Sequence, residues 1–310
     1  MAKKFVTQEY SVSRQGKNIK DGTKRTKHAA WLSGTFFSIS LVFSLCLVAF
    51  TIVFFFSPVF GSSMMATINA DLINDNWPVG DAQHYNADSV IVNKFKKPGR
   101  GDIIVVKHYH DETQDSYHDK NGYYSLFIKR LIAFGGESIY FDRKGIEGTP
   151  AFEYTIYIDG VPLAEDYLIG NDWGHNVAFG DYYDYQTDPN TCPKKGYNGI
   201  GSVPSTQATY NWYDANNEPY FKYNKESERN ELVLPDNYMF YMGDNRCGII
   251  NSPNFDNRNP LKSMDCTAFG PQPYSCLMGT VTEILKKENA VHFAFRKVGE
   301  FFTFRWLFKY

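Results

Sequence analysis

The segment from Trp31 to Phe60 constrains this chain more than any other, because it contains no Lys, Arg, Asp or Glu. A helix of about 20 apolar residues is enough to cross a bilayer, and this run is longer. A cleavable signal peptide is the main alternative, but its apolar core is only about 7–15 residues long. A buried core helix is a weaker alternative. We therefore predict one transmembrane helix over residues 31–60.

The charges on either side of this run predict its orientation. Residues 1–30 are polar and rich in Lys and Arg, without the periodicity of a packed element, which is typical of a disordered tail. After the run, no Lys or Arg occurs before Lys94. Since positive charge favours the cytoplasmic side, we expect a single-pass plasma-membrane protein with a cytoplasmic N-terminus and an extracytoplasmic C-terminal part.

Overall composition argues against a nucleic-acid partner and does not decide whether the cysteines form disulfides. The formal net charge is -2, which gives no support for binding to nucleic acid, and the 22 Tyr and 25 Phe suit a strand-rich protein. Cys46 lies in the apolar run. The four downstream cysteines, which could form disulfides outside the cell or remain free thiols, are Cys192, Cys247, Cys266 and Cys276.

Two short segments carry the candidate chemistry. Ser63 follows the apolar run directly, within Gly61-Ser62-Ser63-Met64-Met65-Ala66-Thr67, and Lys129 lies among apolar residues in Phe127-Ile128-Lys129-Arg130-Leu131-Ile132. A serine hydroxyl needs a base to become a nucleophile, and burial can lower a lysine pKa enough to supply one. We therefore predict a Ser63–Lys129 dyad near the membrane surface; a core strand whose lysine reaches solvent is the alternative.

The rest of the chain predicts strands and turns. Strand candidates with β-branched or alternating character are residues 89–95, 102–107, 127–132, 154–158 and 279–285, and Asp159-Gly160 indicates a hairpin. Residues 165–230 lack a clear period and suggest an inserted, loop-rich subdomain. His108, His110 and His118 could form a metal site, but their spacing in a polar loop favours solvated side chains.

Taken together and in order, these segments resemble bacterial type I signal peptidases, a family of membrane-anchored Ser-Lys proteases. Ser63-Met64-Met65-Ala66-Thr67 is similar to the family's Ser-Met-x-Pro-Thr motif, and Ile128-Lys129-Arg130-Leu131-Ile132 to the segment with the base. Further similarities lie in Val92-Asn93-Lys94-Phe95, Arg100-Gly101-Asp102-Ile103-Ile104-Val105-Val106, Tyr157-Ile158-Asp159-Gly160-Val161-Pro162-Leu163 and Gly243-Asp244-Asn245-Arg246.

The resemblance implies a mainly β fold, an antiparallel signal-peptidase-like sheet with an inserted cap, preceded by one transmembrane helix. It implies a serine endopeptidase that removes signal peptides from exported preproteins after small residues, without metal or cofactor. Ser63 would attack, Lys129 would take the proton, and the Ser63 N–H would donate to the oxyanion. Its partners would be signal peptides and the lipid bilayer, close to the protein export channel.

Two departures from the family pattern concern the support of this dyad. Ala66 stands where the family has proline, and the last signature, Gly-Asp-Asn-Arg-x-x-Ser-x-Asp-Ser-Arg, is interrupted after Arg246. The hydroxyl that supports the lysine in the family would be replaced by Ser252 or Asn254. We expect the oxyanion and supporting residues to be Gly61, Met64, Arg130, Asp244, Arg246, Ser252, Asn254, Asp256 and Arg258.

The predicted organisation follows from these assignments. It comprises a basic cytoplasmic tail (1–30), a transmembrane helix (31–60), a catalytic β core in two parts (61–144 and 236–285), an inserted cap (145–235) and a basic-aromatic C-terminal tail (286–310). Two other functions are compatible with the sequence: a specialised Ser-Lys protease for pilin or surface-protein precursors, and an inactive membrane-anchored binding protein on the same scaffold. A Ser-His-Asp hydrolase and a soluble self-cleaving repressor fit less well.

Overall fold

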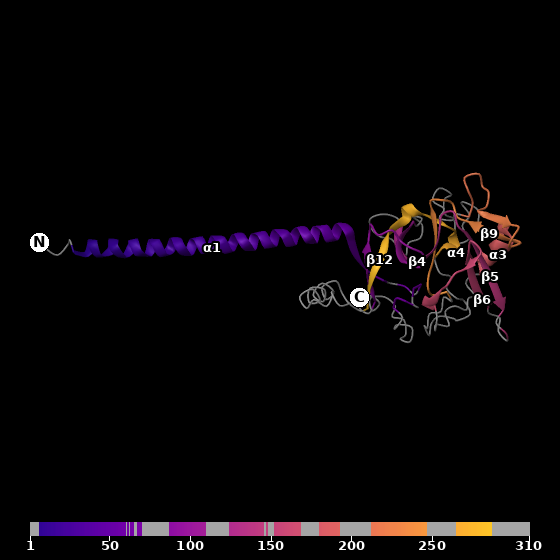
Figure 1. Cartoon of the computed structure of the whole chain (residues 1–310), viewed down its shortest axis with the longest axis horizontal. Helices are drawn as coiled ribbons and strands as arrows, with labels where there is room; N and C mark the ends of the chain where they lie inside the picture. The colour runs from indigo at the N-terminus through magenta and orange to yellow at the C-terminus, as the bar shows by residue number, and fades with distance from the viewer. Residues whose placement is uncertain are drawn as a thin grey trace. The chain divides into compact units, whose positions relative to one another are not determined.

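The computed structural model describes residues 6–59, 61, 63–64, 67–69, 87–109, 124–145, 147, 152–168, 180–192, 212–246 and 265–286. The chain divides into two compact units, Met1–Val53 and Phe54–Tyr310 (Figure 1). The first is one helix and the second contains every described strand.

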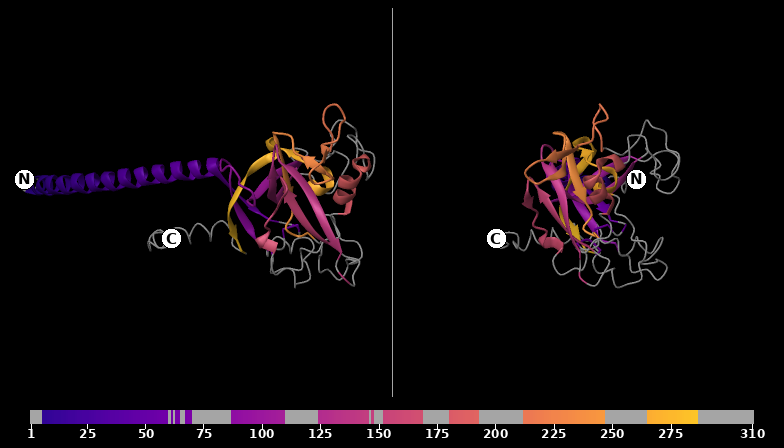
Figure 2. Two further views of the ribbon diagram at one scale, coloured as in Figure 1. Left: turned by 45° about the vertical axis from the view of Figure 1, so that its right-hand side comes forward. Right: turned by 90° about the vertical axis from the view of Figure 1, so that its right-hand side faces the viewer.

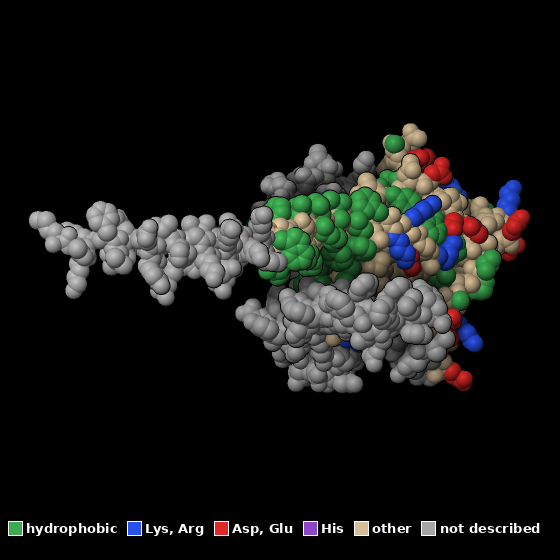
Figure 3. Space-filling model, turned by 60° about the vertical axis from the view of Figure 1, so that its left-hand side comes forward, with side chains coloured by type: hydrophobic (Ala, Val, Ile, Leu, Met, Phe, Trp, Pro, Cys, Tyr) green, Lys and Arg blue, Asp and Glu red, His purple; other side chains and the backbone are tan. Residues whose placement is uncertain are grey.

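The first unit is helix α1, Val6–Val53. Its segment Ala30–Val53 is 24 residues long with a mean hydropathy of 2.5, so it is apolar enough to cross a membrane. The described side chains of this segment form a continuous hydrophobic surface (Figure 3). Large apolar residues such as Phe36 and Phe37 are each 70% exposed, as expected for a helix that faces lipid.

The helix differs from its predicted bounds at both ends. Its backbone is already helical from Val6, where a disordered tail was expected, and no proline interrupts it before Val53. It ends at Val53 instead of residue 60, because Phe54–Pro58 forms strand β1. Aromatic residues favour strands, and an edge strand tolerates a proline at its end.

The first sheet is antiparallel and has the strand order β1-β2-β12-β3-β4-β10-β11. Strand β12 therefore inserts between β2 and β3 from the first half of the chain, as the mixed colours of the sheet show (Figure 2). The strands that follow β1 are β2 Ser89–Asn93, β3 Ile103–Tyr109, β4 Tyr124–Phe134, β10 Tyr238–Met242, β11 Gln272–Pro273 and β12 Leu277–Leu285. The mainly antiparallel β prediction is confirmed.

The second sheet has the order β7-β6-β5-β9-β8. Its strands are β5 Ser138–Gly145, β6 Phe152–Ile158, β7 Val161–Pro162, β8 Phe221–Asn224 and β9 Arg229–Val233. Asp159 and Gly160, with φ of 49° and 77°, form the predicted tight turn between β6 and β7. Both have the positive φ that a type I′ hairpin turn requires.

The two sheets share one hydrophobic core, so the region predicted as a cap packs directly against the rest of the unit. One cluster joins Ile104 and Phe240 of the first sheet to Phe141 and Leu232 of the second. Helix α3, Gly180–Thr187, is tied to β5 through the Gln186 amide, which bonds the backbone N–H and C=O of Phe141 at 2.7 and 3.0 Å.

Short helical turns complete the described secondary structure of this unit. The turns are η2 Asp166–Leu168, η4 Pro189–Thr191, α4 Cys266–Phe269 and η5 Tyr274–Cys276.

The described cysteines of this unit are free thiols. Cys192, Cys266 and Cys276 are buried and free, whereas Cys247 lies outside the described residues. The alternative of free thiols therefore holds for the three described cysteines of this unit.

Candidate active site

The structure brings Ser63 and Lys129 together. Lys129 Nζ and Ser63 Oγ lie 2.6 Å apart and share a hydrogen bond, although the two residues are 66 positions apart in the chain. Lys129 comes from the middle of β4, and Ser63 from the turn that follows β1. The contact has the geometry required for proton transfer between a serine and a basic amine.

The turn that carries Ser63 is fixed on both sides. Met64 is buried, and its carbonyl accepts hydrogen bonds from the N–H groups of Thr67 and Ile68 at 2.9 and 2.7 Å. On the other side, the Asn245 N–H donates to the Ser63 carbonyl at 2.9 Å. Gly61 has φ of 100°, a left-handed conformation that glycine adopts without steric cost.

Reciprocal hydrogen bonds between Asn69 and Asp88 fix the ends of the segment that carries Ser63. The Asn69 N–H donates to Asp88 Oδ2 at 2.7 Å, and the Asp88 N–H donates to Asn69 Oδ1 at 2.6 Å. The Asn69 amide also donates to the Val59 carbonyl at 3.0 Å. The segment between Val59 and Asn69 is therefore held at its two ends, which limits where Ser63 can lie.

Burial changes the acidity of Lys129. Its residue surface is 3% exposed, and this desolvation lowers the pKa of Lys129 from 10.5 to about 8. The charges of Asp265 and Asp244 act in the opposite direction and limit the decrease in pKa. The amine is consequently a far better proton acceptor near neutral pH than an exposed lysine.

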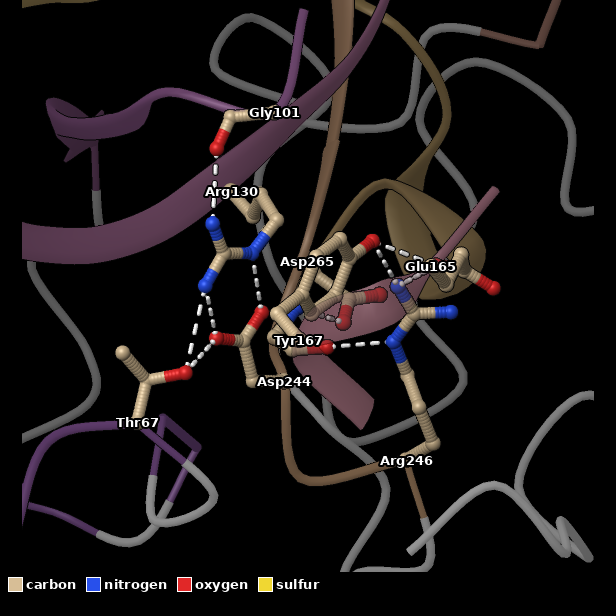
Figure 4. A network of polar contacts seen from close by, with 9 residues as sticks. Thr67, Gly101, Arg130, Glu165, Tyr167, Asp244, Arg246 and Asp265 are labelled. Atoms are coloured by element: carbon tan, nitrogen blue, oxygen red, sulfur yellow. Dashed lines mark hydrogen bonds and ion pairs between the residues drawn. The ribbon is translucent and has the colours of Figure 1, made fainter. Parts of the chain in front are cut away.

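The residue next to the lysine organises the surrounding loops (Figure 4). Arg130 forms a bidentate pair with Asp244, through Nε to Oδ1 at 2.7 Å and through a terminal nitrogen to Oδ2. Its other nitrogen donates to the Gly101 carbonyl at 2.7 Å, and Thr67 Oγ1 donates to Asp244. This network links β4, the Ser63 turn and the segment that follows β10, and it restricts where the Ser63 turn can lie.

Arg246 connects the same region to the segment around η2 (Figure 4). Its guanidinium pairs with Glu165, and its Nε donates to the Gly243 carbonyl at 2.6 Å. Burial raises the pKa of Tyr167, whose hydroxyl donates to Glu165. The Tyr167 ring also covers the Arg130 guanidinium, with 3.8 Å from the guanidinium carbon to the ring centroid.

Asp265 is a residue that the sequence reasoning missed. It is buried, accepts the Gly243 N–H at 3.0 Å, and caps α4 by accepting the Thr267 N–H at 3.0 Å. Its charge makes the largest contribution that raises the pKa of Lys129. The spacing Ser263-Met264-Asp265, which matches Ser-x-Asp in the last family signature, could have identified it.

The other predicted supporting residues cannot be placed. Ser252, Asn254, Asp256 and Arg258 lie outside the described residues, as does Ser263. Most of the histidine-rich loop between β3 and β4 lies outside them too. Their roles stay predictions.

An apolar helix followed by an antiparallel β unit that holds a partly buried serine–lysine contact is an arrangement expected of a membrane-anchored peptidase. The family model described as signal peptidase, peptidase S26, matches residues 33–285. The chain belongs to this family. It is also similar to signal peptidase I of Aquifex aeolicus (strain VF5), at 27% identity over 173 residues, which are 51% of this chain and 59% of the relative. The chain thus matches less than two thirds of that relative's length.

Proposed function

We propose that the protein is a signal peptidase I, a membrane-anchored serine endopeptidase that removes signal peptides from exported preproteins after small residues. The observation that carries the proposal is the hydrogen bond between the partly buried Ser63 Oγ and the buried Lys129 Nζ, at 2.6 Å. Family membership and the similarity to the Aquifex aeolicus protein support the substrate class.

The chemistry follows from the acidity of the lysine. With a pKa of about 8, Lys129 is neutral in about a tenth of the molecules at pH 7. Neutral Lys129 accepts the proton of Ser63 Oγ as the oxygen attacks the scissile carbonyl, and an acyl-enzyme forms. Lys129 then donates this proton to the leaving amine. The Ser63 N–H would donate to the oxyanion, and water would release the acyl group with Lys129 as base again.

The edge of β4 offers a place for an extended peptide. β3 pairs with β4 from Arg130 to Tyr124, whereas β10 pairs with it only from Arg130 to Phe134. Among the described strands, none covers the β10 side of β4 between Tyr124 and Lys129. A peptide that adds to this edge as a strand would present its backbone carbonyls beside the dyad.

Strand register also links the dyad to the membrane. Phe54, the first residue after α1, pairs with Asn93, and the same row continues through Thr280 and Ile104 to Lys129. With strands about 4.8 Å apart, Lys129 lies about 19 Å across the sheet from Phe54. This position suits a substrate that is itself inserted in the membrane, and the proposed orientation places the β unit on the extracytoplasmic side, close to the export channel.

Cleavage of a preprotein by the detergent-solubilised full chain tests the proposal. Ser63→Ala and Lys129→Ala should each reduce the rate by a factor on the order of 10⁴ or more. Two variants serve as matched controls and should cleave the preprotein at the wild-type rate. Ser57→Ala removes a hydroxyl from β1, and Lys222→Ala removes an exposed lysine from β8.

The pH dependence gives a second criterion. The wild-type rate should increase with pH and reach half its maximum near pH 8, where Lys129 becomes neutral. Full activity of Lys129→Ala would refute the dyad and return attention to a histidine base. A wild-type chain that binds preproteins without cutting them would favour the binding-protein alternative.

A further inference from the structure

A polar clamp joins the second sheet to the site; it consists of the side chains of Glu165 and Arg246 and the hydroxyl of Tyr167. The Arg246 guanidinium donates to Glu165 and, at 3.2 Å, to the Tyr167 hydroxyl, which itself donates to Glu165. The side chain of Arg246 is 3% exposed and that of Glu165 is 15% exposed. The clamp therefore fixes the hydroxyl end of Tyr167 (Figure 4).

The backbone that carries Glu165 and Tyr167 is fixed to the second sheet. Just after β7, the Leu163 N–H donates to the Ile156 carbonyl of β6 at 2.7 Å, and the Leu163 side chain packs against the shared hydrophobic core. The Leu168 N–H then donates to the Glu165 carbonyl at 2.8 Å and closes the turn. The second sheet thus sets the position of Tyr167.

The ring of Tyr167 covers one face of Arg130, a residue of the first sheet. Along its edge, Arg130 donates two hydrogen bonds to Asp244. It also donates to Thr67 Oγ1 at 3.1 Å and to the Gly101 carbonyl at 2.7 Å. Since a guanidinium with bonded edges meets water mainly at its faces, a ring on one face excludes water and adds a cation–π attraction. The ring therefore favours the closed Arg130–Asp244 pair.

This pair is connected to both members of the dyad. Arg130 follows Lys129 on β4, so a displacement of the Arg130 backbone also moves the base. Asp244 precedes Asn245, whose N–H donates to the Ser63 carbonyl at 2.9 Å. The contact between Lys129 Nζ and Ser63 Oγ is 2.6 Å long, and a misplacement of about 1 Å can cost about 10²-fold in rate.

We propose that Tyr167 is a positioning residue for the dyad, and that the clamp holds its ring over Arg130. The inference rests on the proposed function and deepens it, because it makes the second sheet a part of the site. Tyr167 acts through Arg130 and Asp244, and it takes no part in the proton transfer itself. Loss of the ring should therefore reduce the rate of the chemical step more than the affinity for the substrate.

Steady-state cleavage of a preprotein by the detergent-solubilised full chain tests this role, with kcat and KM measured separately. Tyr167→Ala removes the ring, and Tyr167→Phe removes only the hydroxyl. Tyr213→Ala is the matched control, because Tyr213 also packs against the shared core and its hydroxyl donates to the Pro189 carbonyl at 3.1 Å. All rates are divided by the folded fraction, which circular dichroism measures.

We expect Tyr167→Ala to lower kcat by about tenfold or more, whereas KM changes by less than about threefold. Tyr167→Phe, which keeps the ring over Arg130, should recover kcat to within about threefold of the wild type. Tyr213→Ala should lower the unfolding temperature without lowering kcat. Glu165→Ala combined with Tyr167→Ala should be no slower than Tyr167→Ala alone, since both changes act through the same ring.

Two results would overturn the positioning role: a kcat for Tyr167→Ala within about twofold of the wild type, or an equal loss in Tyr213→Ala. A double variant whose loss is the product of the two single losses would overturn the role of Glu165. If Tyr167→Ala does not fold, Tyr167→Leu replaces it with the same expectations, because leucine keeps an apolar side chain without a flat ring.

Amide hydrogen exchange distinguishes this inference from the proposed function, because it requires no turnover. In Tyr167→Ala, peptides that contain Thr67 and Asn245 should exchange these amides about tenfold or more faster than in the wild type, and peptides from β9 should not change. Faster exchange in a chain whose wild type cuts no preprotein would support the positioning by Tyr167 and overturn the proposed function. Unchanged exchange would overturn the positioning role, whether or not the wild type cuts.

Discussion

Replacing Lys129 by methionine tests the energetic consequence of burying an amine beside Ser63. Methionine has a similar length and is always neutral. Burial lowers the pKa of Lys129 from 10.5 to about 8, and one pKa unit corresponds to about 1.4 kcal/mol. A protonated Lys129 therefore destabilises the fold by about 3 kcal/mol relative to a neutral side chain of the same size.

The sign of the pH dependence follows from proton binding. Between pH 8 and 10.5, the unfolded chain holds more protons than the folded chain, because Lys129 titrates lower in the folded state. The free energy of unfolding of the wild type therefore increases with pH in this window. The variant lacks this increase, so its advantage should be greatest below pH 8. The lost hydrogen bond to Ser63 subtracts about 1 kcal/mol at every pH.

Denaturant unfolding of the full chain in detergent measures this difference, with tryptophan fluorescence as the signal, since Trp212 is fully buried in the core. From pH 7 to 9.5, the advantage of Lys129→Met over the wild type should shrink by about 2 kcal/mol. Lys222→Met, at an exposed position on β8, should show no such trend. A difference between Lys129→Met and the wild type that stays constant over this range would refute the assignment of a lowered pKa to Lys129.

Three further predictions follow from the same region. Asp265→Asn should move the pH–rate profile to lower pH, because the charge that raises the pKa of Lys129 is lost while one of the two acceptor oxygens is kept; an unmoved profile contradicts this. Asp244→Asn should lower the free energy of unfolding by about 3–5 kcal/mol in denaturant titrations, since it leaves a buried guanidinium unpaired; a loss below 1 kcal/mol would count against the network. Gly135→Ala should destabilise the fold in the same assay, because its Cβ would lie 2.1 Å from a backbone oxygen, whereas Gly145→Ala, with nothing within 4 Å, is the neutral control.

Local patterns were sufficient to predict most elements near the site. Alternating β-branched residues predicted β2 and β3, and the apolar residues around Lys129 predicted β4. These predictions were possible because side-chain periodicity and strand propensity depend only on neighbouring residues in the chain. Asp159-Gly160 gave the turn for the same reason. The helix end was misplaced, since Phe54–Pro58 is as apolar as a membrane helix and only pairing with β2 makes it a strand.

Distant partners could not be predicted in this way. Asp265 follows a long insertion. The spacing Ser263-Met264-Asp265 could mark it as a site residue, but it does not show that Asp265 lies against Gly243 or acts on Lys129. The pairing of Arg246 with Glu165 likewise joins residues 81 positions apart. The loop-rich reading of residues 165–230 missed β8 and β9, whose apolar residues pack into a core shared by both sheets.

The sequence by itself determined that the chain has a helix long and apolar enough to cross a bilayer, a strand-rich remainder, and a serine and a lysine in the motifs of one family. These properties reside in composition, periodicity and spacing, which are local. Only the tertiary structure decided that the two side chains meet at 2.6 Å, how far burial lowers the pKa of Lys129, and which carboxylates oppose that shift. These three properties depend on desolvation and on charges that strand pairing brings close together. Both conditions arise only when the sheet has formed.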